Sequence, residues 1–451
     1  MAVTHERRRL GRVDAVLREM GESLPQGLVP ARIFNDPDIH ELELERIFAR
    51  AWVFVGHESE IPRPGDFALR YVGNDSFIFV RDERGQVRLL LNSCRHRGTQ
   101  VCRAEQGRAA HFTCPYHGWT YRTTGELTGV PAYEEGFPAL DRREWSLLQA
   151  PQVASLHGFV FACLDPDAPS FDEYLGGMKW YFDLMFGLND AGLEVAGPPQ
   201  RWVMNANWKS GAENLAGDNY HTTVVHKSLF QIGMLHLSPL ANMTGYHVQP
   251  GNGHALSFAV AADPAAPGPQ FWGLPAEVVR TFRPDKLSVE QYELARRARN
   301  TMGTVFPNFS FIRTPSSPDP ERVPLTTFNR IWQWQPRGPD TVEVWSWVMV
   351  YRDTSPEFRD RSYTAGRSAF GPGGLFDQDD TMPWQTIARS AGTVFFGKAG
   401  AKLNYQMGLA EASISRLETD WPGPGTAYFP RHDERYALEL YTKWHEYMTR
   451  E

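Results

Sequence analysis

Two short motifs, each combining one cysteine with one histidine, constrain this chain more than any other feature of its sequence. The segment CRHRG places Cys94 and His96 two positions apart, and CPYHGW places Cys114 and His117 three positions apart. These spacings bring a thiol and an imidazole to one tight loop, and apolar packing has no reason to select such residues in pairs. Two loops of this kind that face each other can enclose a metal centre, so we expect one here.

The donor set of two sulfurs and two imidazoles admits two kinds of metal centre. A structural zinc ion commonly takes the same four donors, but its usual motifs group them as CxxC and HxxxH rather than as mixed pairs. In a two-iron cluster, one iron can take two thiolates and the other two neutral imidazoles. The smaller negative charge then raises the reduction potential above that of an all-cysteine cluster. The mixed pairs favour the cluster, with zinc as the alternative.

Composition excludes several classes of protein. The chain carries 46 Lys and Arg against 53 Asp and Glu, a net charge of −7, so it offers no basic surface to a nucleic acid. Its first 24 residues are charged throughout and no long apolar run follows, so we expect neither a signal peptide nor a membrane span. Only four cysteines occur. This number suits metal ligands in a reducing compartment, and we expect a cytoplasmic protein.

Hydrophobic periodicity divides the chain into three regions. Residues 1–50 are expected to be helical towards their end, where Asp36 can cap an amphipathic helix that has Pro37 at its first position. Residues 51–165 contain short β-rich runs, such as FALRYV and SFIFVRD, between Gly, Pro and Asp residues. This pattern predicts a small antiparallel β domain that holds both Cys/His motifs. Residues 166–451, long enough for a separate core, form the third region.

The third region mixes helices and strands. A helical pattern covers residues 172–187, and the strand-like runs LTTFNRIWQWQ and TVEVWSWVMVYR flank the turn sequence PRGPD, which predicts a long hairpin. Residues 313–324 are rich in Pro and Ser and are expected to form a surface loop. The C-terminal segment predicts an amphipathic helix packed on the sheet. Its apolar face comprises Ala437, Leu440, Tyr441, Trp444 and Met448.

The densest polar constellation is the segment ENLAGDNYHTTVVH. Asp218 and His221 are three positions apart, so on a helix they share a face and can hydrogen-bond. His221 and His226 are five apart, so a helix must bulge or end between them if both bind one metal. Two histidines and one carboxylate leave positions open on Fe(II) for dioxygen and substrate. The alternative is a pair of histidines on a solvated helix face.

The Cys/His motifs, with Gly98, Gly118 and Trp119, resemble the signature of Rieske [2Fe-2S] proteins. The resemblance implies that Cys94 and Cys114 bind one iron and that His96 and His117 bind the other. Cys102 and Cys163 match nothing in the signature and are expected to be core thiols.

The segment from residue 205 to 226 resembles the catalytic iron motif of Rieske ring-hydroxylating oxygenases, with Asn-Trp-Lys, Glu-Asn, Gly-Asp, Tyr-His and a final His in the same order. The resemblance makes His221 and His226 iron ligands and gives Asn214 and Asp218 catalytic roles. It implies that Asp218 bonds His221 and, across a subunit boundary, His117. The third ligand falls in GPGGLFDQDDTMPW, where the lead-in favours Asp380 over the neighbouring Asp379.

The resemblance covers nearly the whole chain and is to the catalytic α subunits of the biphenyl, naphthalene and polycyclic-hydrocarbon group. It implies an α+β fold: an antiparallel β Rieske domain inserted in a helix-grip-like catalytic domain, whose antiparallel sheet is flanked by helices. It implies cis-dihydroxylation of an aromatic ring by O₂ at a mononuclear Fe(II). NADH would supply electrons only indirectly, through a reductase and often a ferredoxin, to an α₃β₃ hexamer with a small β subunit.

The substrate class stays open between two kinds of aromatic compound. Apolar residues near the expected ligands could line a pocket for a hydrocarbon. They are Leu215, Phe370, Phe376 and Trp384, with Met234, Leu235 and Phe306 as further candidates. An aromatic carboxylate such as phthalate or benzoate would instead need a cation, for which Lys227, His236 and Arg313 are candidates. A zinc-stabilised, non-catalytic binding protein is a third reading.

Overall fold

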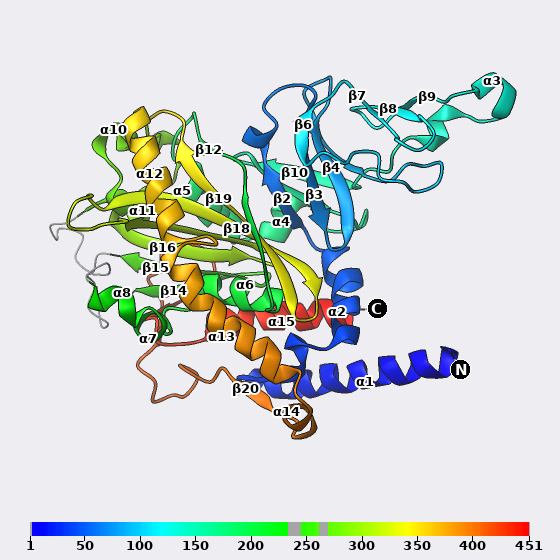
Figure 1. Ribbon diagram of the computed structural model, residues 1–451. Coiled ribbons are helices and arrows are strands. Elements are labelled where there is room, and N and C mark those ends of the chain that lie inside the picture. Colours follow the sequence, from blue (N-terminus) through cyan, green and yellow to red (C-terminus); the bar gives the residue numbers. More distant parts are fainter. Residues whose placement is uncertain (1, 233–244, 261–268, 451) are drawn as a thin grey trace. The chain divides into compact units, whose positions relative to one another are not determined.

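The chain divides into two compact units, seen in Figure 1. The computed structural model describes residues 2–232, 245–260 and 269–450. The larger unit comprises Met1–Ile47 and Pro169–Glu451, and the smaller unit is the continuous segment Phe48–Ala168. The smaller unit is therefore an insertion in the larger one, and the fold is α+β, as the resemblance implies.

The smaller unit is built of short antiparallel strands. Its sheets have the orders β5-β4-β3-β6, β10-β11-β2 and β7-β8-β9. Strands β2 and β11 are buried along their whole lengths, because apolar residues occupy both of their faces. The strands are β2 (Val53–His57), β3 (Asp66–Val72), β4 (Asp75–Arg81), β5 (Val87–Leu91), β6 (Gln106–Arg108), β7 (His111–Thr113), β8 (Thr120–Arg122), β9 (Leu127–Gly129), β10 (Gln152–Leu156) and β11 (Phe159–Cys163).

One antiparallel sheet forms the centre of the larger unit. Its order is β12-β19-β18-β17-β16-β15-β14-β22-β21, and β13 also pairs with β19. The two long central strands are buried along nearly all of their length, with Trp332 and Trp334 of one strand on one face of the sheet and Trp345 and Trp347 of the other strand on the opposite face. The strands are β12 (Leu193–Val195), β13 (Gln200–Met204), β14 (Tyr246–Gly251), β15 (His254–Val260), β16 (Ala298–Val305), β17 (Phe309–Ser316), β18 (Thr326–Gly338), β19 (Thr341–Tyr351), β21 (Arg416–Glu418) and β22 (Thr426–Phe429).

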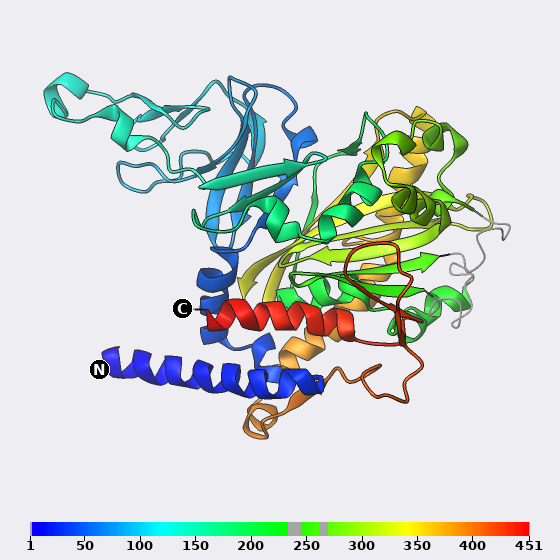
Figure 2. The ribbon, with the colours of Figure 1, turned by 180° about the vertical axis from the view of Figure 1, so that it is seen from behind.

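Helices flank this sheet, as Figures 1 and 2 show. Helix α6 (Trp208–Gly217) packs on β15 to β18, α15 (Arg435–Thr449) on β14 and β15, and α12 (Pro356–Ala369) on β17 to β19. The other described α-helices of the larger unit are α1 (Ala2–Ser23), α2 (Pro37–Glu43), α4 (Phe171–Leu175), α5 (Met178–Phe186), α7 (Thr222–Val225), α8 (Lys227–Gln231), α10 (Ala276–Val279), α11 (Val289–Arg297), α13 (Leu375–Ala391) and α14 (Val394–Lys398). None of the described helices has the length and apolar character that a membrane crossing requires.

Most of the expected elements are present with changed boundaries. The β18–β19 hairpin and the C-terminal helix α15 are confirmed, and every residue expected on the apolar face of α15 is buried. Helix α2 starts as expected, because the Asp36 carboxylate accepts a hydrogen bond from the Asp38 amide. Beyond Glu43 the chain forms a π-helical turn, so the expected α-helix is shorter. The helix expected over 172–187 is two helices, α4 and α5, separated by Gly176.

The expectation that residues 313–324 form a surface loop is wrong at its start. Strand β17 runs to Ser316, and the Arg313 side chain is buried in the sheet. Proline and serine suggested a loop there, but the pairing of β17 with β18 continues through Pro315.

Candidate active site

Two loops of the smaller unit present the four Cys/His donors with the same hydrogen-bond pattern. In one, the Cys94 amide donates to the Thr99 carbonyl and the Gly98 amide donates back to the Cys94 carbonyl. In the other, the Cys114 amide donates to Trp119 and the Gly118 amide to Cys114. The φ angles of Gly98 and Gly118 are 75° and 73°, a left-handed conformation that favours glycine. The glycine in each motif therefore closes its loop.

The two thiols of the Cys/His motifs lie next to each other, and so do the two imidazoles. Cys94 lies beside Cys114, and the rings of His96 and His117 lie with their centroids 4.6 Å apart. The His96 ring stacks on Trp119 at 5.0 Å, and its buried Nδ1 has no hydrogen-bond partner. A thiol pair next to an imidazole pair, with a buried nitrogen left unpaired, fits a two-iron cluster.

The spread of these donors argues against a single zinc ion. Tetrahedral zinc holds its ligands at about 2.0–2.3 Å, so ligand atoms around it lie within roughly 4 Å of one another. Within the described part of the chain, only His221, His226 and Asp380 bring three ligand atoms within 4.8 Å of one another. The Cys/His set therefore spans more than the coordination sphere of one ion.

The second candidate centre begins where α6 ends. At Gly217 a side chain would collide with Tyr436 and His247, so glycine permits the close approach of these elements. Asp218 caps α6, and its Oδ1 accepts hydrogen bonds from the amides of Tyr220 and His221. The expected Asp218–His221 contact therefore forms in a turn and not on a helical face.

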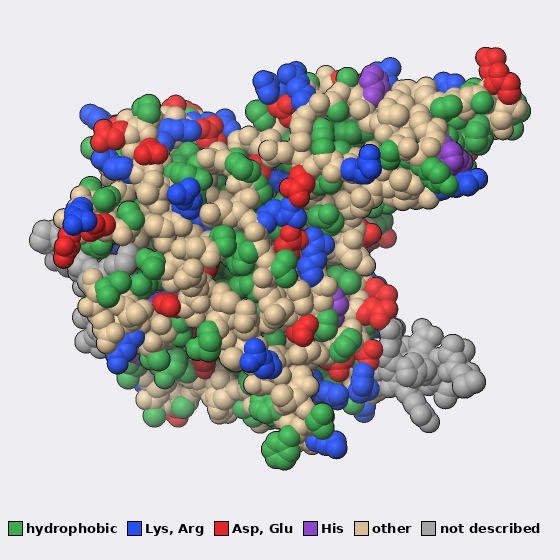
Figure 3. Space-filling view, viewed as in Figure 1, with side chains coloured by type: hydrophobic (Ala, Val, Ile, Leu, Met, Phe, Trp, Pro, Cys, Tyr) green, Lys and Arg blue, Asp and Glu red, His purple; other side chains and the backbone are tan. Residues whose placement is uncertain are grey.

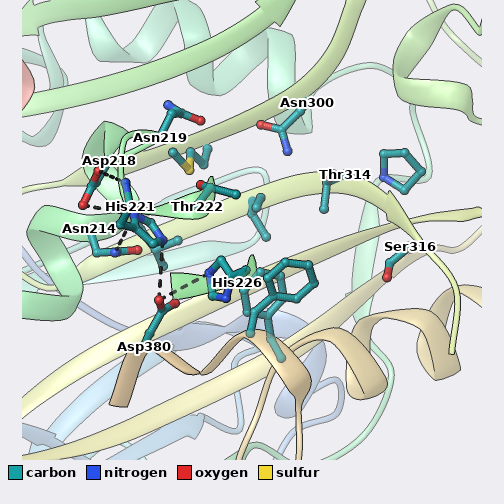
Figure 4. A pocket seen from close by; sticks show the side chains of 16 residues that line it. Asn214, Asp218, Asn219, His221, Thr222, His226, Asn300, Thr314, Ser316 and Asp380 are labelled. Atoms are coloured by element: carbon teal, nitrogen blue, oxygen red, sulfur yellow. Dashed lines mark hydrogen bonds and ion pairs between the residues drawn. The ribbon is translucent and has the colours of Figure 1, made fainter. Parts of the chain in front are cut away.

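His221, His226 and Asp380 meet in the larger unit, as Figure 4 shows. The short helix α7 starts after His221 and ends before His226, so the helix boundary expected between the two histidines is present. Asp380, on α13, has its Oδ1 3.4 Å from His221 Nε2 and 3.3 Å from His226 Nε2. Two imidazole nitrogens and a carboxylate oxygen converging from separate elements fit a mononuclear iron with open positions.

The electrostatics of this trio also favour a bound cation. Burial raises the pKa of Asp380 to about 7, and its Oδ1 has no hydrogen-bond donor. Burial opposes a charged His221 ring, but Asp218 and Asp380 raise the pKa of His221 to about 9. A metal cation would hold the buried carboxylate ionised in place of a proton.

Each histidine of the trio also has a second carboxylate at its other nitrogen. Asp218 Oδ2 lies 3.0 Å from His221 Nδ1, and Asp379 Oδ2 lies 3.2 Å from His226 Nδ1. Asn214 Nδ2 also lies near His221 Nδ1, at 3.4 Å. The proton on His221 Nδ1 is donated to Asp218, because the Asp218 carboxylate is nearer and charged. The contact between Asp379 and His226 was not predicted from the sequence, which shows only that two acids are adjacent at these positions.

A pocket adjoins the trio, with a cavity volume of about 120 Å³. The expected residues Leu215, Phe370 and Phe376 line it, and Phe370 stacks on Phe376 at 5.0 Å. The expectation for Trp384 is wrong: its ring packs edge-on against Trp334 at 5.7 Å and is core. Phe306 is core as well, stacked on Tyr447.

The candidate cations do not line this pocket where the structure describes them. The Arg313 guanidinium donates to Asn329 and the Met185 carbonyl and lies over Trp272. Lys227 is exposed. Residues Met234, Leu235 and His236 lie outside the described part of the chain.

Strands β16 and β17 contribute lining residues that the sequence did not reveal. These are Asn300, Met302, Ile312, Thr314 and Ser316. The sequence shows that these residues are two positions apart along each strand and therefore share a face. It does not show which face borders a pocket, because that depends on the strand register.

The inserted β unit holds a site for a Rieske cluster. The antiparallel sheet domain that surrounds it in the sequence holds a site with two histidines and one carboxylate. Together, the two sites define a Rieske non-haem iron oxygenase. Residues 51–151 match the model of the Rieske [2Fe-2S] domain, and residues 171–402 match that of the ring-hydroxylating α subunit catalytic domain. The chain belongs to the family of ring-hydroxylating oxygenase α subunits. It is therefore an oxidoreductase whose cofactors are a Rieske [2Fe-2S] cluster and a mononuclear iron.

Similar proteins extend over nearly the whole chain. The crystal structure of naphthalene 1,2-dioxygenase from Rhodococcus sp. bound to indole is 42% identical, covers 96% of this chain and 97% of its own, and has a TM-score of 0.91. The N,N-dimethyl phenylurea N-demethylase subunit alpha of Sphingobium sp. (strain YBL2) is 38% identical, with 97% of this chain and 94% of that protein covered. Biphenyl 2,3-dioxygenase subunit alpha of Rhodococcus jostii (strain RHA1) is 36% identical, with 97% and 92% covered.

Proposed function

We propose that this chain is the terminal oxygenase subunit that adds both atoms of O₂ to the ring of an uncharged aromatic compound of the hydrocarbon type. The observation that carries the proposal is the convergence of His221, His226 and Asp380 beside a pocket lined by Leu215 and Phe370. An iron bound there would activate O₂ with electrons from the Rieske cluster.

The proposed ligand sets follow the geometry of each unit. Cys94 and Cys114 would hold one iron of the cluster and His96 and His117 the other, in a domain proposed to span residues 51–165. The proximity of the two thiols and the unpaired His96 Nδ1 support this division. Residues 1–50 and 166–451 would form the catalytic domain, with His221, His226 and Asp380 as its iron ligands.

In the catalytic domain, neighbouring polar groups would hold the ligands in position. Asp218 would keep the proton of His221 on Nδ1, which leaves Nε2 free for the metal, and this role rests on their 3.0 Å contact. Asn214, beside the same ring, would restrict its rotation. Burial of the trio and the apolar walls would limit the access of water to the reacting ring.

The electron supply and assembly are also proposals. The chain shows no nicotinamide- or flavin-binding motif in its sequence, so a reductase, with or without a ferredoxin, would carry electrons from NADH. We infer a small β subunit and an α₃β₃ hexamer, in which Asp218 of one copy would approach His117 of the next. The four free thiols fit a cytoplasmic setting.

Pocket charge favours an uncharged substrate over an aromatic carboxylate. No Lys or Arg occurs among the described residues that line the pocket, whereas Asp218 and Asp380 do. A benzoate or phthalate would therefore lose its hydration without gaining a charged partner. Oxidative N-demethylation is a second candidate, because the 38% identical relative is a phenylurea N-demethylase subunit.

The test is turnover under ¹⁸O₂ by the chain combined with its β subunit, a ferredoxin and a reductase. With isopropylbenzene as the substrate, we expect a cis-dihydrodiol that carries two ¹⁸O atoms, and no product from Asp380→Ala. Exclusive turnover of phthalate, or formaldehyde release from an N-methyl arylurea with no ring product from any arene, would contradict the proposal.

A further inference from the structure

The active-site pocket has a polar end that ring oxidation does not require. Asn300 on β16 and Thr314 and Ser316 on β17 line it. In Figure 4 these three side chains lie on the far side of the cavity from His221 and Asp380. A substrate ring held near the iron ligands would therefore direct a substituent towards them.

The register of two paired strands builds this polar end. Met302 pairs with Ile312 across β16 and β17, and both line the pocket. Because side chains alternate along a strand, Asn300 and Thr314 share the face of this apolar pair, one step further along. The opposite face faces the core: Thr301 Oγ1 accepts a hydrogen bond from Trp272 Nε1. The pocket wall thus changes from apolar to polar along one sheet face.

The three polar side chains are not engaged within the described protein. Asn300, Thr314 and Ser316 have no side-chain hydrogen bond to any described residue, although all three are half-buried. By contrast, the neighbouring Ser317 donates to the Val323 carbonyl. Two hydroxyls and one carboxamide therefore remain available to a ligand, and they can both donate and accept hydrogen bonds.

Cavity size limits what can reach these groups. The volume of about 120 Å³ is near that of an apolar cavity of about 150 Å³ that binds benzene. The described walls therefore suit one aromatic ring with a small substituent.

We propose that the pocket selects a single aromatic ring bearing a small, neutral, hydrogen-bonding substituent such as a carboxamide, which Asn300, Thr314 and Ser316 hold. The inference rests on the proposed function and narrows its substrate class. A bare hydrocarbon would displace water from three polar side chains without replacing its hydrogen bonds, which lowers affinity. An anionic substituent would find no Lys or Arg among the described lining residues.

The test compares three ligands with the same number of heavy atoms: benzamide, isopropylbenzene and benzoate. Binding to the iron-loaded αβ complex is measured by calorimetry without reductant, so that no turnover is needed. We expect Asn300→Leu to weaken benzamide binding about tenfold and to strengthen isopropylbenzene binding. Thr314→Val should act in the same direction, and benzoate should bind most weakly to the wild type. Ser317→Ala, which removes a hydroxyl outside the lining, should change neither affinity.

The outcomes separate this inference from the proposed function. If Asn300→Leu and Thr314→Val leave the benzamide and isopropylbenzene affinities unchanged, or if benzoate binds most tightly, the polar end does not select substrates and the inference is overturned. Ring oxidation of isopropylbenzene by the reconstituted enzyme would still support the proposed function. If the affinities change as expected but none of the three rings is oxidised, the proposed function fails.

Discussion

At the scale of single residues, adjacent acids on one helix have different partners. Residues next to each other on a helix point about 100° apart, so Asp380 faces both Nε2 atoms while Asp379 faces His226 Nδ1. A carboxylate at Nδ1 fixes the tautomer and the ring orientation of a histidine ligand. This geometry suits Asp379 to a positioning role at His226, like the role proposed for Asp218 at His221.

Removing this carboxylate should weaken the mononuclear iron site alone. We expect Asp379→Ala to lower iron affinity about 10- to 100-fold, measured by competition with a chelator, because His226 loses its orienting acceptor. Asp379→Asn keeps an acceptor oxygen and should lose less. The exposed Asp360→Ala is the control. Equal iron retention by the wild type and Asp379→Ala would show that Asp379 does not position His226.

At the scale of elements, buried polar groups join the helices around the iron site. Lys209 on α6 forms a fully buried ion pair with Glu43 on α2, and Glu43 also accepts from Trp208 and Trp444. Glu213 on α6 accepts hydrogen bonds from Tyr441 on α15 and from Tyr405. These contacts fix α6, and therefore the turn that carries Asp218.

Breaking the buried ion pair should be costly. We expect Lys209→Met to lower the free energy of unfolding by about 3–5 kcal/mol, because Glu43 is left as an uncompensated buried charge. Urea unfolding followed by fluorescence measures the change. Lys179→Met removes an exposed ion pair with Asp172 and should cost at most about 1 kcal/mol. Equal effects of the two substitutions would contradict the role given to the buried pair.

Glu213 should make stability depend on pH. Burial, together with the nearby Asp218 and Glu434, raises the pKa of Glu213 to about 8 despite the two tyrosine hydrogen bonds. A carboxyl group with a raised pKa in the folded state binds more protons folded than unfolded, so its contribution to stability falls as pH rises from about 4.5 to 8.

The variant Glu213→Gln cannot titrate at this position. Relative to this variant, the wild type should lose up to about 1 kcal/mol of unfolding free energy per pH unit between pH 6 and pH 8. Its melting temperature should fall accordingly over this range. Glu411→Gln, at an exposed position, should follow the wild type. A constant difference in melting temperature between wild type and Glu213→Gln across this range would show that Glu213 is ionised in the fold.

At the scale of the whole molecule, local sequence signals predicted what depends on neighbours in the chain. The Cys/His loops, the hairpin β18–β19 and the helix α15 could be read because turn residues and periodicity specify them locally. The Asp379 contact, the core position of Trp384 and the polar end formed by Asn300 and Thr314 could not. They depend on strand register and helix packing, which bring together residues far apart in the sequence.

The central claim is that one chain holds two chemically different iron centres, one in each unit. The most direct test is an anaerobic count of iron and acid-labile sulfide, with an EPR spectrum of the reduced, fully loaded protein. Two irons and two sulfides for the cluster and one further iron give three irons per chain. We expect Asp380→Ala to lose only the mononuclear iron and to keep both sulfides and the EPR signal of the reduced cluster. Zinc in place of iron, or three irons retained by Asp380→Ala, would contradict the account.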